Sequence, residues 1–227
     1  MNNNEIEELR EAVALANRVL HHTGLTTYLG HASARIPGTD RVLIKRNGTI
    51  AVSMDTTTIK DILLADLDGN QLDGQSVGKL PAEWPLHAEI YKARPDVMGV
   101  VHTHQRWATT FGIAGAKILP VQHPVHAAVA GEEIPVYDES YAIVTTDEQA
   151  RVVAETMGKR LTCHLRTHGM VFAAGSVQAA VWTAVDLEYQ AELTYLASQI
   201  GTPNTIPMLF MREHLERRKA GQAGNSW

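Results

Sequence analysis

The sequence predicts a single α/β domain, residues 1–227, whose central sheet is mixed and mostly antiparallel. Three observations lead to this fold class. Amphipathic helical segments alternate with short strands rich in β-branched residues. The first strands come in pairs around turns that contain glycine, which favours hairpins over parallel crossover units. No repeat, linker or low-complexity block interrupts the 227 residues, a length sufficient for one sizeable core.

The N-terminal third of the chain predicts one helix followed by strands. Residues 5–22 carry apolar side chains at three- and four-residue spacing, with glutamates in the first turns, where the helix dipole favours them. Residues 32–36 and 41–45 are expected to pair as a hairpin. A second hairpin, with an Asp-Gly turn, is expected within residues 61–74.

The rest of the chain alternates between helices and strands. A strand is expected at residues 97–104, and a strand pair with a His-Gly turn at residues 161–175. Four helices are expected, at residues 81–94, 107–115, 147–161 and 176–201. The end of the chain is expected to be part helical, and its Gly- and Ser-rich segment, about residues 218–227, is typical of disorder.

The composition excludes several classes of function. The net charge is −5 and Lys and Arg do not cluster before the C-terminal segment, whereas a nucleic-acid-binding protein normally shows a basic face. The N-terminus is polar and acidic, unlike a signal peptide, and no apolar run approaches the ~20 residues that span a bilayer. The single cysteine, Cys163, is expected to be buried in a strand and fits a reducing compartment. We therefore expect a cytoplasmic protein that binds neither nucleic acid nor membrane.

The most informative run of the chain is VMGVVHTHQ, residues 97–105. Side chains alternate between the two faces of a strand, so His102 and His104 are expected to present two imidazoles on the same face at the strand end. Neutral imidazole is the commonest protein ligand for a divalent transition metal. The alternative is an ordinary surface pair of histidines.

Two further residues favour the metal site over a surface pair. Glu83 lies upstream in PAEWPLH and His168 downstream in RTHGM. Three imidazoles and an acid suit Zn²⁺, Mn²⁺, Co²⁺ or Fe²⁺ with a position open for substrate. Taken alone, Glu83 also fits a simple role at a helix N-terminus, which the dipole favours. His87 lies one helical turn after Glu83 and either orients it or packs.

These segments resemble a known family. PAEWPLHAEIYKARPDVMGVVHTHQ and LRTHGMVFAAG are similar to the signatures of the class II aldolase/adducin family, which includes fuculose-phosphate aldolase and ribulose-phosphate 4-epimerase. The shared pattern is Glu-Trp, a helix with His and Tyr, Arg-Pro-Asp, a strand that ends in His-x-His, and a later Thr-His-Gly. The similarity extends from the first helix through the long C-terminal helix.

The resemblance implies a fold and a set of site residues. It implies a three-layer α/β/α domain, assembled as a homotetramer with sites at subunit boundaries. It makes His102, His104 and His168 the ligands of one divalent metal per subunit, and Glu83 the catalytic acid/base or a fourth ligand. The expected partner is a small anionic substrate.

Departures from the family pattern concern the substrate. The sugar-phosphate aldolases have an Asn where this chain has His31, a Thr-Gly phosphate loop where it has Lys45, Arg46, Asn47 and Gly48, and a pair of serines where it has Pro-Ala at 81–82. Proline has no backbone donor and alanine no hydroxyl, so phosphate binding is weakened. Lysine and arginine remain, and arginine is suited to binding carboxylates. We therefore expect residues 45–48 to bind the substrate, and His31 to bind it or to transfer a proton.

The segment GHASARIP is most similar to the family's branch of metal-dependent decarboxylases of hydroxylated aromatic or pyridine dicarboxylates. The sequence therefore predicts a metal-dependent carbon–carbon lyase that decarboxylates a hydroxylated aromatic or heteroaromatic acid. The alternatives are an aldolase or epimerase for a sugar or sugar-acid derivative and, more remotely, a non-catalytic module similar to the adducin head.

Overall fold

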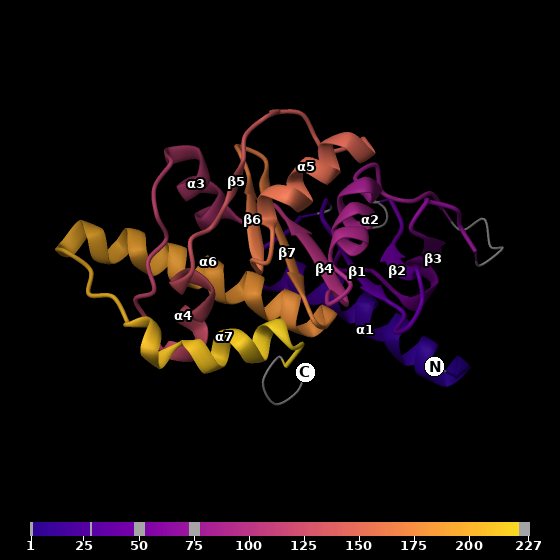
Figure 1. Ribbon diagram of the computed structural model, residues 1–227, viewed down its shortest axis with the longest axis horizontal. Helices are drawn as coiled ribbons and strands as arrows, with labels where there is room; N and C mark the ends of the chain where they lie inside the picture. Colours follow the sequence, from indigo (N-terminus) through magenta and orange to yellow (C-terminus); the bar gives the residue numbers. More distant parts are fainter. Residues whose placement is uncertain (1, 28, 48–52, 73–77, 223–227) are drawn as a thin grey trace.

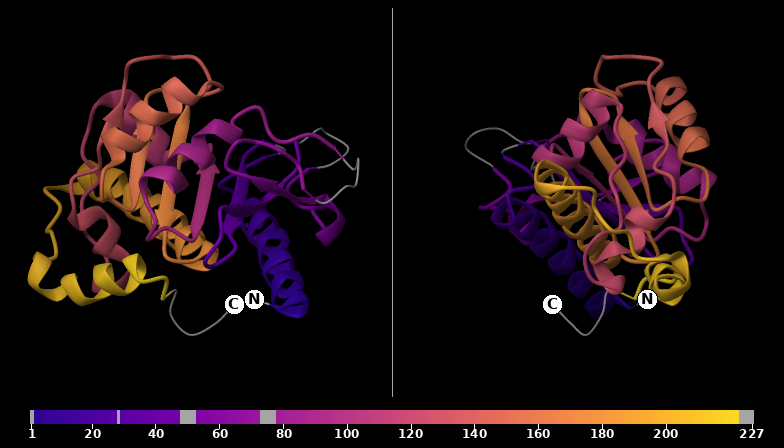
Figure 2. Two further views of the ribbon diagram at one scale, coloured as in Figure 1. Left: turned by 45° about the vertical axis from the view of Figure 1, so that its right-hand side comes forward. Right: turned by 90° about the vertical axis from the view of Figure 1, so that its left-hand side faces the viewer.

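A seven-stranded sheet forms the middle layer of the protein, with helices on both sides (Figures 1 and 2). The computed structural model describes residues 2–27, 29–47, 53–72 and 78–222. The strands are β1 (His31–Arg35), β2 (Arg41–Lys45), β3 (Ile62–Asp66), β4 (Gly99–Thr103), β5 (Val136–Tyr137), β6 (Thr162–Leu165) and β7 (Gly169–Ala174).

The strand order is β3-β2-β1-β4-β7-β6-β5. Every neighbouring pair is antiparallel except β5 and β6, so the expected mixed, mostly antiparallel sheet is confirmed. β4 lies at the centre, between β1 and β7. Because antiparallel neighbours bring chain-distant strand ends together, the end of β4 meets both the start of β1 and the turn before β7.

Two groups of helices cover the two faces of the sheet. One face packs against α2 (Trp84–Ala93) and α5 (Asp147–Met157), and the other against α1 (Asn3–His22), α3 (Arg106–Ala114) and α6 (Val177–Ile200). Shorter segments complete the layers: 3-10 turns at Ile59–Asp61, Ala128–Gly131 and Met208–Phe210, and the helices α4 (Pro124–Ala127) and α7 (Arg212–Lys219). The three-layer α/β/α arrangement implied by the sequence is therefore present.

Strand alternation decides which side chains reach each face. In β1, Ala32 and Ala34 join the core against α1 and α6, whereas His31 and Ser33 hydrogen-bond to α2. In β4 the same alternation places Val101 on the face covered by α1 and α6, and His102 on the face covered by α2. The polar side chains of the two central strands thus share the α2 face.

Helix α2 begins later than the sequence suggests. We expected residues 81–94, but the helix starts at Trp84, with Glu83 as its N-cap residue and proline within its first two positions. A proline in the first turn loses no hydrogen bond, since the first backbone donors of a helix have no partner within it. Glu83 therefore lies at the N-terminal end of α2.

The C-terminal segment differs in part from its expected disorder. Helix α7 continues through Lys219, and Arg218 is buried in an ion pair with Asp186 of α6. The pairing explains why this short polar helix is ordered against the long one. Residues 223–227 lie outside the described part of the chain.

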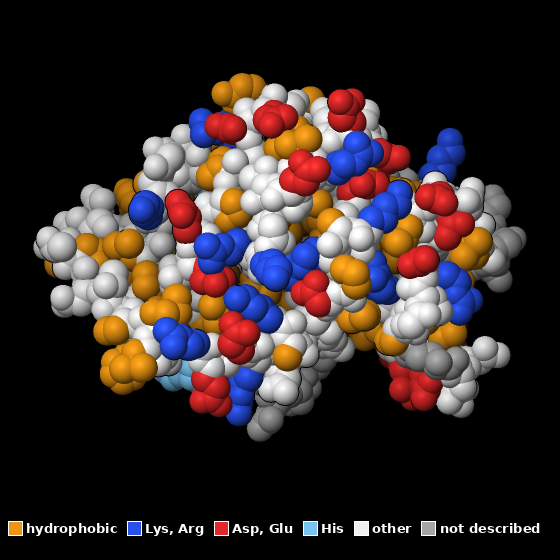
Figure 3. Space-filling view, viewed as in Figure 1, with side chains coloured by type: hydrophobic (Ala, Val, Ile, Leu, Met, Phe, Trp, Pro, Cys, Tyr) orange, Lys and Arg blue, Asp and Glu red, His pale blue; other side chains and the backbone are white. Residues whose placement is uncertain are grey.

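Figure 3 shows acidic and basic side chains interspersed over the face that carries α2, α5 and α7. Among the described helices, none combines the length and the apolar character that a crossing of the bilayer requires.

Candidate metal centre

Four side chains converge where the central strands end: Glu83, His102, His104 and His168. The Nε2 atom of His104 lies 2.9 Å from Nε2 of His102 and 3.2 Å from Nε2 of His168. The carboxylate of Glu83 closes the group, with Oε2 3.3 Å from Nε2 of His102 and Oε1 3.7 Å from Nε2 of His168. The four side chains that the sequence selected are therefore brought together.

Backbone geometry fixes the two histidines at the end of β4. His102 belongs to the strand, and His104 follows it, with its backbone N–H donating to the carbonyl of Leu25. The two rings lie on the same face with centroids 4.8 Å apart. This is the spacing that alternate residues of an extended chain provide.

His168 reaches the cluster through a tight turn. It precedes Gly169, the first residue of β7, where an added Cβ would lie 2.2 Å from the carbonyl oxygen of Thr103 and 3.0 Å from the ring of His104. Any side chain at this position would push β7 away from the end of β4. The glycine is therefore required to seat His168 beside His104.

Hydrogen bonding fixes the tautomer of one ring. Nδ1 of His102 donates to the carbonyl oxygen of Met170 at 3.0 Å, and a carbonyl can only accept. In a neutral imidazole the other nitrogen then carries the lone pair. Nε2 of His102 thus faces Glu83 and His104 as an acceptor, the form that a metal ligand needs.

The donor set fits a divalent metal ion. A tetrahedral ion with bonds of about 2.1 Å holds its ligand atoms about 3.4 Å apart. The four contacts of 2.9 to 3.7 Å bracket this value. The cluster can therefore bind one divalent metal.

The protonation states of His104, His168 and Glu83 also favour metal binding. Burial lowers the pKa of His104 to about 3 and that of His168 to about 4. Burial alone raises the pKa of Glu83, but its contacts with His102 and His31 outweigh burial and hold that pKa well below its usual range. Two neutral imidazoles and an ionised carboxylate are available near neutral pH, as metal binding requires.

His31 adjoins the cluster at the start of β1. Its Nε2 lies 3.8 Å from Oε2 of Glu83, and its ring centroid lies 5.2 Å from that of His102, its register partner in β4. Its Nδ1 lies 2.8 Å from Nε2 of His87. From the sequence, His87 was expected either to orient Glu83 or to pack; in the structure its ring contacts His31.

The sequence contained an unused signal for this contact. His31 and Ser33 are two residues apart on a strand, and His87 and Tyr91 four apart on a helix, so each pair shares a face. Their side chains are joined by hydrogen bonds. Each periodicity predicts that its two side chains share a face, but neither indicates which strand the helix covers.

The residues expected to bind substrate are placed unequally. Lys45 is 1% exposed, its burial lowers its pKa to about 8, and its charge acts on His31. Arg46 instead forms an ion pair with Asp61, Nε to Oδ1 at 2.9 Å. Asn47 is exposed, with its backbone N–H donating to the carbonyl of Lys79. Gly48 lies outside the described residues. Of the described members, Lys45 has an electrostatic link to the centre, and the binding role of the set stays a prediction.

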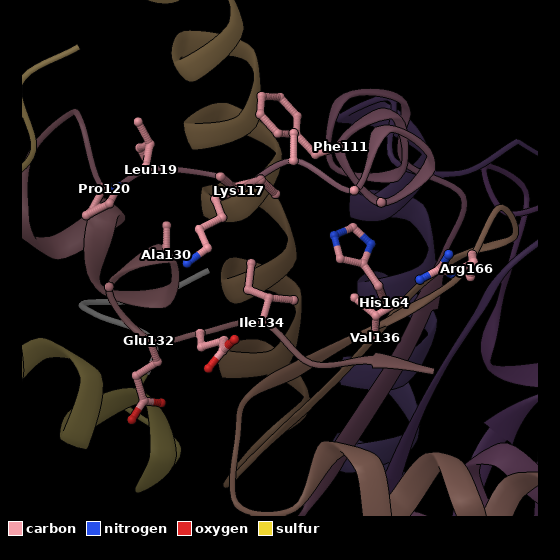
Figure 4. A pocket seen from close by; sticks show the side chains of 16 residues that line it. Phe111, Lys117, Leu119, Pro120, Ala130, Glu132, Ile134, Val136, His164 and Arg166 are labelled. Carbon is pink, nitrogen blue, oxygen red and sulfur yellow. The ribbon is translucent and has the colours of Figure 1, made fainter. Parts of the chain in front are cut away.

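A separate cavity of about 470 Å³ lies on the other face of the sheet, bordered by α3 and β5 (Figure 4). His164 of β6 projects into it and is 4% exposed. Burial lowers its pKa to about 4. Among the residues that the structure describes, none hydrogen-bonds to its ring. This histidine was given no role from the sequence, and it lies apart from the metal centre.

Comparison with known proteins identifies relatives over most of the chain. Residues 11–195 match the family model of the Class II Aldolase and Adducin N-terminal domain. A 3,4-dihydroxyphthalate decarboxylase from Arthrobacter keyseri is 37% identical over 199 residues, 85% of this chain and 79% of the relative. A 5-methylthioribulose-1-phosphate/5-deoxyribulose-1-phosphate aldolase from Rhodospirillum rubrum is 32% identical over 180 residues, 79% of this chain and 77% of the relative.

A solved structure shows the same fold. An aldolase II superfamily protein from Pseudomonas syringae superimposes with a TM-score of 0.77 at 25% identity, covering 94% of this chain and 85% of the other. The relatives thus include both a decarboxylase and an aldolase. The solved structure shares the three-layer fold in which Glu83 and the three histidines come together.

Proposed function

This chain belongs to the class II aldolase and adducin family and is a metal-dependent lyase. We propose that its reaction is the decarboxylation of a hydroxylated aromatic or heteroaromatic acid. One observation carries this choice. A buried histidine, His31, lies beside Glu83 of the metal centre, and the charge of a buried lysine, Lys45, acts on it, where sugar-phosphate aldolases are expected to have phosphate-binding residues. A hydrogen-bond donor and a cation together favour a carboxylate. The decarboxylase relative, at 37% identity, supports the same reaction.

The metal and the protein side chains divide the work. A divalent metal held by His102, His104 and His168 would polarise the substrate's oxygen and stabilise negative charge on the neighbouring carbon. Lys45 and His31 bind the carboxylate group and fix its orientation. Binding in one orientation removes much of the entropic part of the barrier.

Glu83 moves the proton. As an ionised carboxylate it accepts the proton of the substrate hydroxyl. When the carbon–carbon bond breaks, its electron pair stays on the ring carbon and CO₂ leaves. Glu83 then returns its proton to that carbon, so the proton count balances over the step. Acid–base transfer of this kind contributes about 10²- to 10⁴-fold to a rate.

A pair of substrate panels tests the proposal. The purified enzyme, loaded with Zn²⁺, Mn²⁺, Co²⁺ or Fe²⁺ in turn, is incubated with hydroxylated aromatic dicarboxylic acids, including 3,4-dihydroxyphthalate, and CO₂ release is measured. A second panel contains 5-deoxyribulose 1-phosphate and L-fuculose 1-phosphate, and aldehyde release is measured. CO₂ from the first panel supports the proposal. Efficient cleavage of the second panel with no CO₂ from the first would establish the aldolase alternative.

We also propose that the enzyme is a homotetramer with its sites at subunit boundaries. Large apolar side chains are exposed on the C-terminal end of α6 and the segment that follows: Tyr195, Leu196, Ile200, Leu209 and Phe210. Ile200 is 90% exposed, and large apolar side chains left exposed in this number favour burial against another chain. Light scattering of the purified protein should give four times the mass of one chain, and a monomer at micromolar concentration would disprove the assembly.

A further inference from the structure

A line of buried polar side chains leads from the metal centre into the core between β1 and α2. Nδ1 of His31 lies 2.8 Å from Nε2 of His87, whose Nδ1 lies 2.7 Å from Oγ of Ser33. The serine Oγ lies 2.9 Å from the hydroxyl of Tyr91. His87, Ser33 and Tyr91 are each 0% exposed, and His31 is 7% exposed. A fully buried chain of four groups costs stability unless every hydrogen bond is made, so its direction is constrained.

The direction of the hydrogen bonds follows from the outer end. Oε2 of Glu83 lies 3.8 Å from Nε2 of His31, and an ionised carboxylate can only accept. A hydrogen on Nε2 faces this oxygen favourably, which leaves the lone pair of a neutral His31 on Nδ1. His87 must then donate from Nε2 and accept at Nδ1.

The inner groups complete the same direction. Ser33 donates its hydroxyl hydrogen to Nδ1 of His87, and Tyr91 donates its hydrogen to Oγ of Ser33. The opposite direction would place the lone pair of His31 against the carboxylate of Glu83, with two acceptors facing each other. Both directions pair the inner donors, because the hydroxyl groups of Tyr91 and Ser33 also reach the carbonyl of Val100. The carboxylate of Glu83 beside Nε2 of His31 is therefore the feature that favours the first direction.

We propose that His87 is a positioning residue that, with Ser33 and Tyr91 behind it, holds His31 in the tautomer with hydrogen on Nε2, so that His31 selects substrates that offer a carboxylate oxygen. The inference rests on the proposed function, because it names the device that recognises the carboxylate. It gives His31 the role of an obligatory hydrogen-bond donor and leaves proton transfer to Glu83.

The selectivity follows from what surrounds the binding position. His31 offers N–H, and the charge of Lys45 acts on the same region. Both favour an anionic oxygen, and a substrate without one leaves the buried donor of His31 unpaired. An unpaired buried donor lowers the affinity by about five- to 150-fold.

A spectroscopic experiment tests the tautomer without any substrate. The Zn²⁺-loaded enzyme is labelled with ¹⁵N-histidine, and long-range ¹H–¹⁵N correlations show which ring nitrogens carry hydrogen. His31 is assigned by its absence from His31→Asn. We expect hydrogen on Nε2 alone in the wild type and a mixture of tautomers in Ser33→Ala, whose smaller change keeps the test usable if variants of His87 do not fold. Hydrogen on Nδ1 of His31, or on both nitrogens, would overturn the proposal.

Ligand binding tests the consequence. Kd values of phthalate and benzoate, which differ by one carboxylate, are measured for Zn²⁺-loaded wild type, His87→Phe and His87→Gln. The ratio of the two affinities should fall about tenfold in His87→Phe, within the range for lost outer-shell partners, and recover in His87→Gln, which can still donate to His31. A general loss of packing would weaken both ligands equally and leave the ratio unchanged.

The control is His164→Phe, a matched substitution of a buried histidine on the opposite face of the sheet. Its ratio should equal that of the wild type. An unchanged ratio in folded His87→Phe, or an equal fall in His164→Phe, would disprove the role of His87. Neither readout requires turnover, so failure of the CO₂ assay with the expected tautomer and ratio would reject the proposed reaction and not this inference.

Discussion

Both faces of the sheet bury histidines, but the residues that surround these histidines differ. On the α2 face, His31, His102, His104 and His168 lie near one another and near Glu83, with ring centroids 4.8 to 5.2 Å apart where they adjoin. On the α3 face, His164 lies alone in a cavity, and burial is the cause of its lowered pKa. The same residue type, buried by the same sheet, forms a candidate metal centre on one side and a solitary ring on the other.

The difference between the two faces is convergence with an acid, because burial is common to both. Burial lowers the pKa of His104 and of His164 in the same direction, to about 3 and about 4. The cluster of Glu83 and the three histidines also brings several ligand atoms close together and includes a carboxylate that balances the charge of a metal ion. Substitutions on one face at a time test this difference.

Removing a metal ligand should have the largest effect. His102→Ala should lose bound metal and lower turnover by on the order of 10³-fold or more, because the metal contributes several kcal/mol of transition-state stabilisation. Metal content by mass spectrometry and turnover are measured together. His164→Phe, the matched change on the other face, should keep both within about twofold. Full metal occupancy in His102→Ala would remove the cluster from consideration as the metal site.

His164 should contribute to the loss of stability at acid pH. Its folded-state pKa of about 4 lies below the ordinary value of about 6.5, so the unfolded chain binds a proton first as the pH falls. Stability is unaffected above about pH 6.5 and falls by about 3 kcal/mol between there and pH 4. In His164→Phe this part of the loss should be absent. Urea unfolding at pH 7 and pH 4 measures it, and equal pH dependence in the two proteins would contradict the prediction.

Glu83 should matter for turnover more than for folding. Glu83→Gln preserves the shape of the side chain and removes the basic oxygen, so turnover should fall on the order of 10²-fold. Circular dichroism and the midpoint of thermal unfolding serve as the check on the fold. A near-normal rate in a well-folded variant would assign Glu83 to the N-terminus of α2 alone.

The smallest effect should separate two neighbouring cations at the end of β2. Lys45→Met should raise KM for a dicarboxylate about tenfold, as expected for loss of one buried charged contact. Arg46→Met should leave KM within about twofold, because its guanidinium is engaged by Asp61, and should cost about 1 kcal/mol of stability at most. If Arg46→Met raises KM more than Lys45→Met does, the assignment of the two residues is reversed.

Much of the fold could be predicted because local sequence patterns indicate its strands, turns and helices. Alternating apolar residues and Gly-containing turns predicted the β1–β2 hairpin, and helical periodicity predicted α1, α5 and α6. The start of α2 was misplaced by three residues, since proline is compatible with both the first helical turn and the loop before it. In the described part of the second hairpin, the expected turn is present, and the strand after it pairs with β3 as one bridge, between Ala65 and Gln71.

By itself the sequence determined the family and the four side chains of the candidate centre, because the spacing of His102 and His104 and the order of Glu83 and His168 are properties of the chain alone. Only the tertiary structure decided the partners of His31 and His87, the engagement of Arg46 by Asp61 and the isolation of His164. The physical reason is the same in each case. Strand order and helix placement bring residues tens of positions apart into hydrogen-bond distance, and no local pattern encodes which face of which strand a helix will cover.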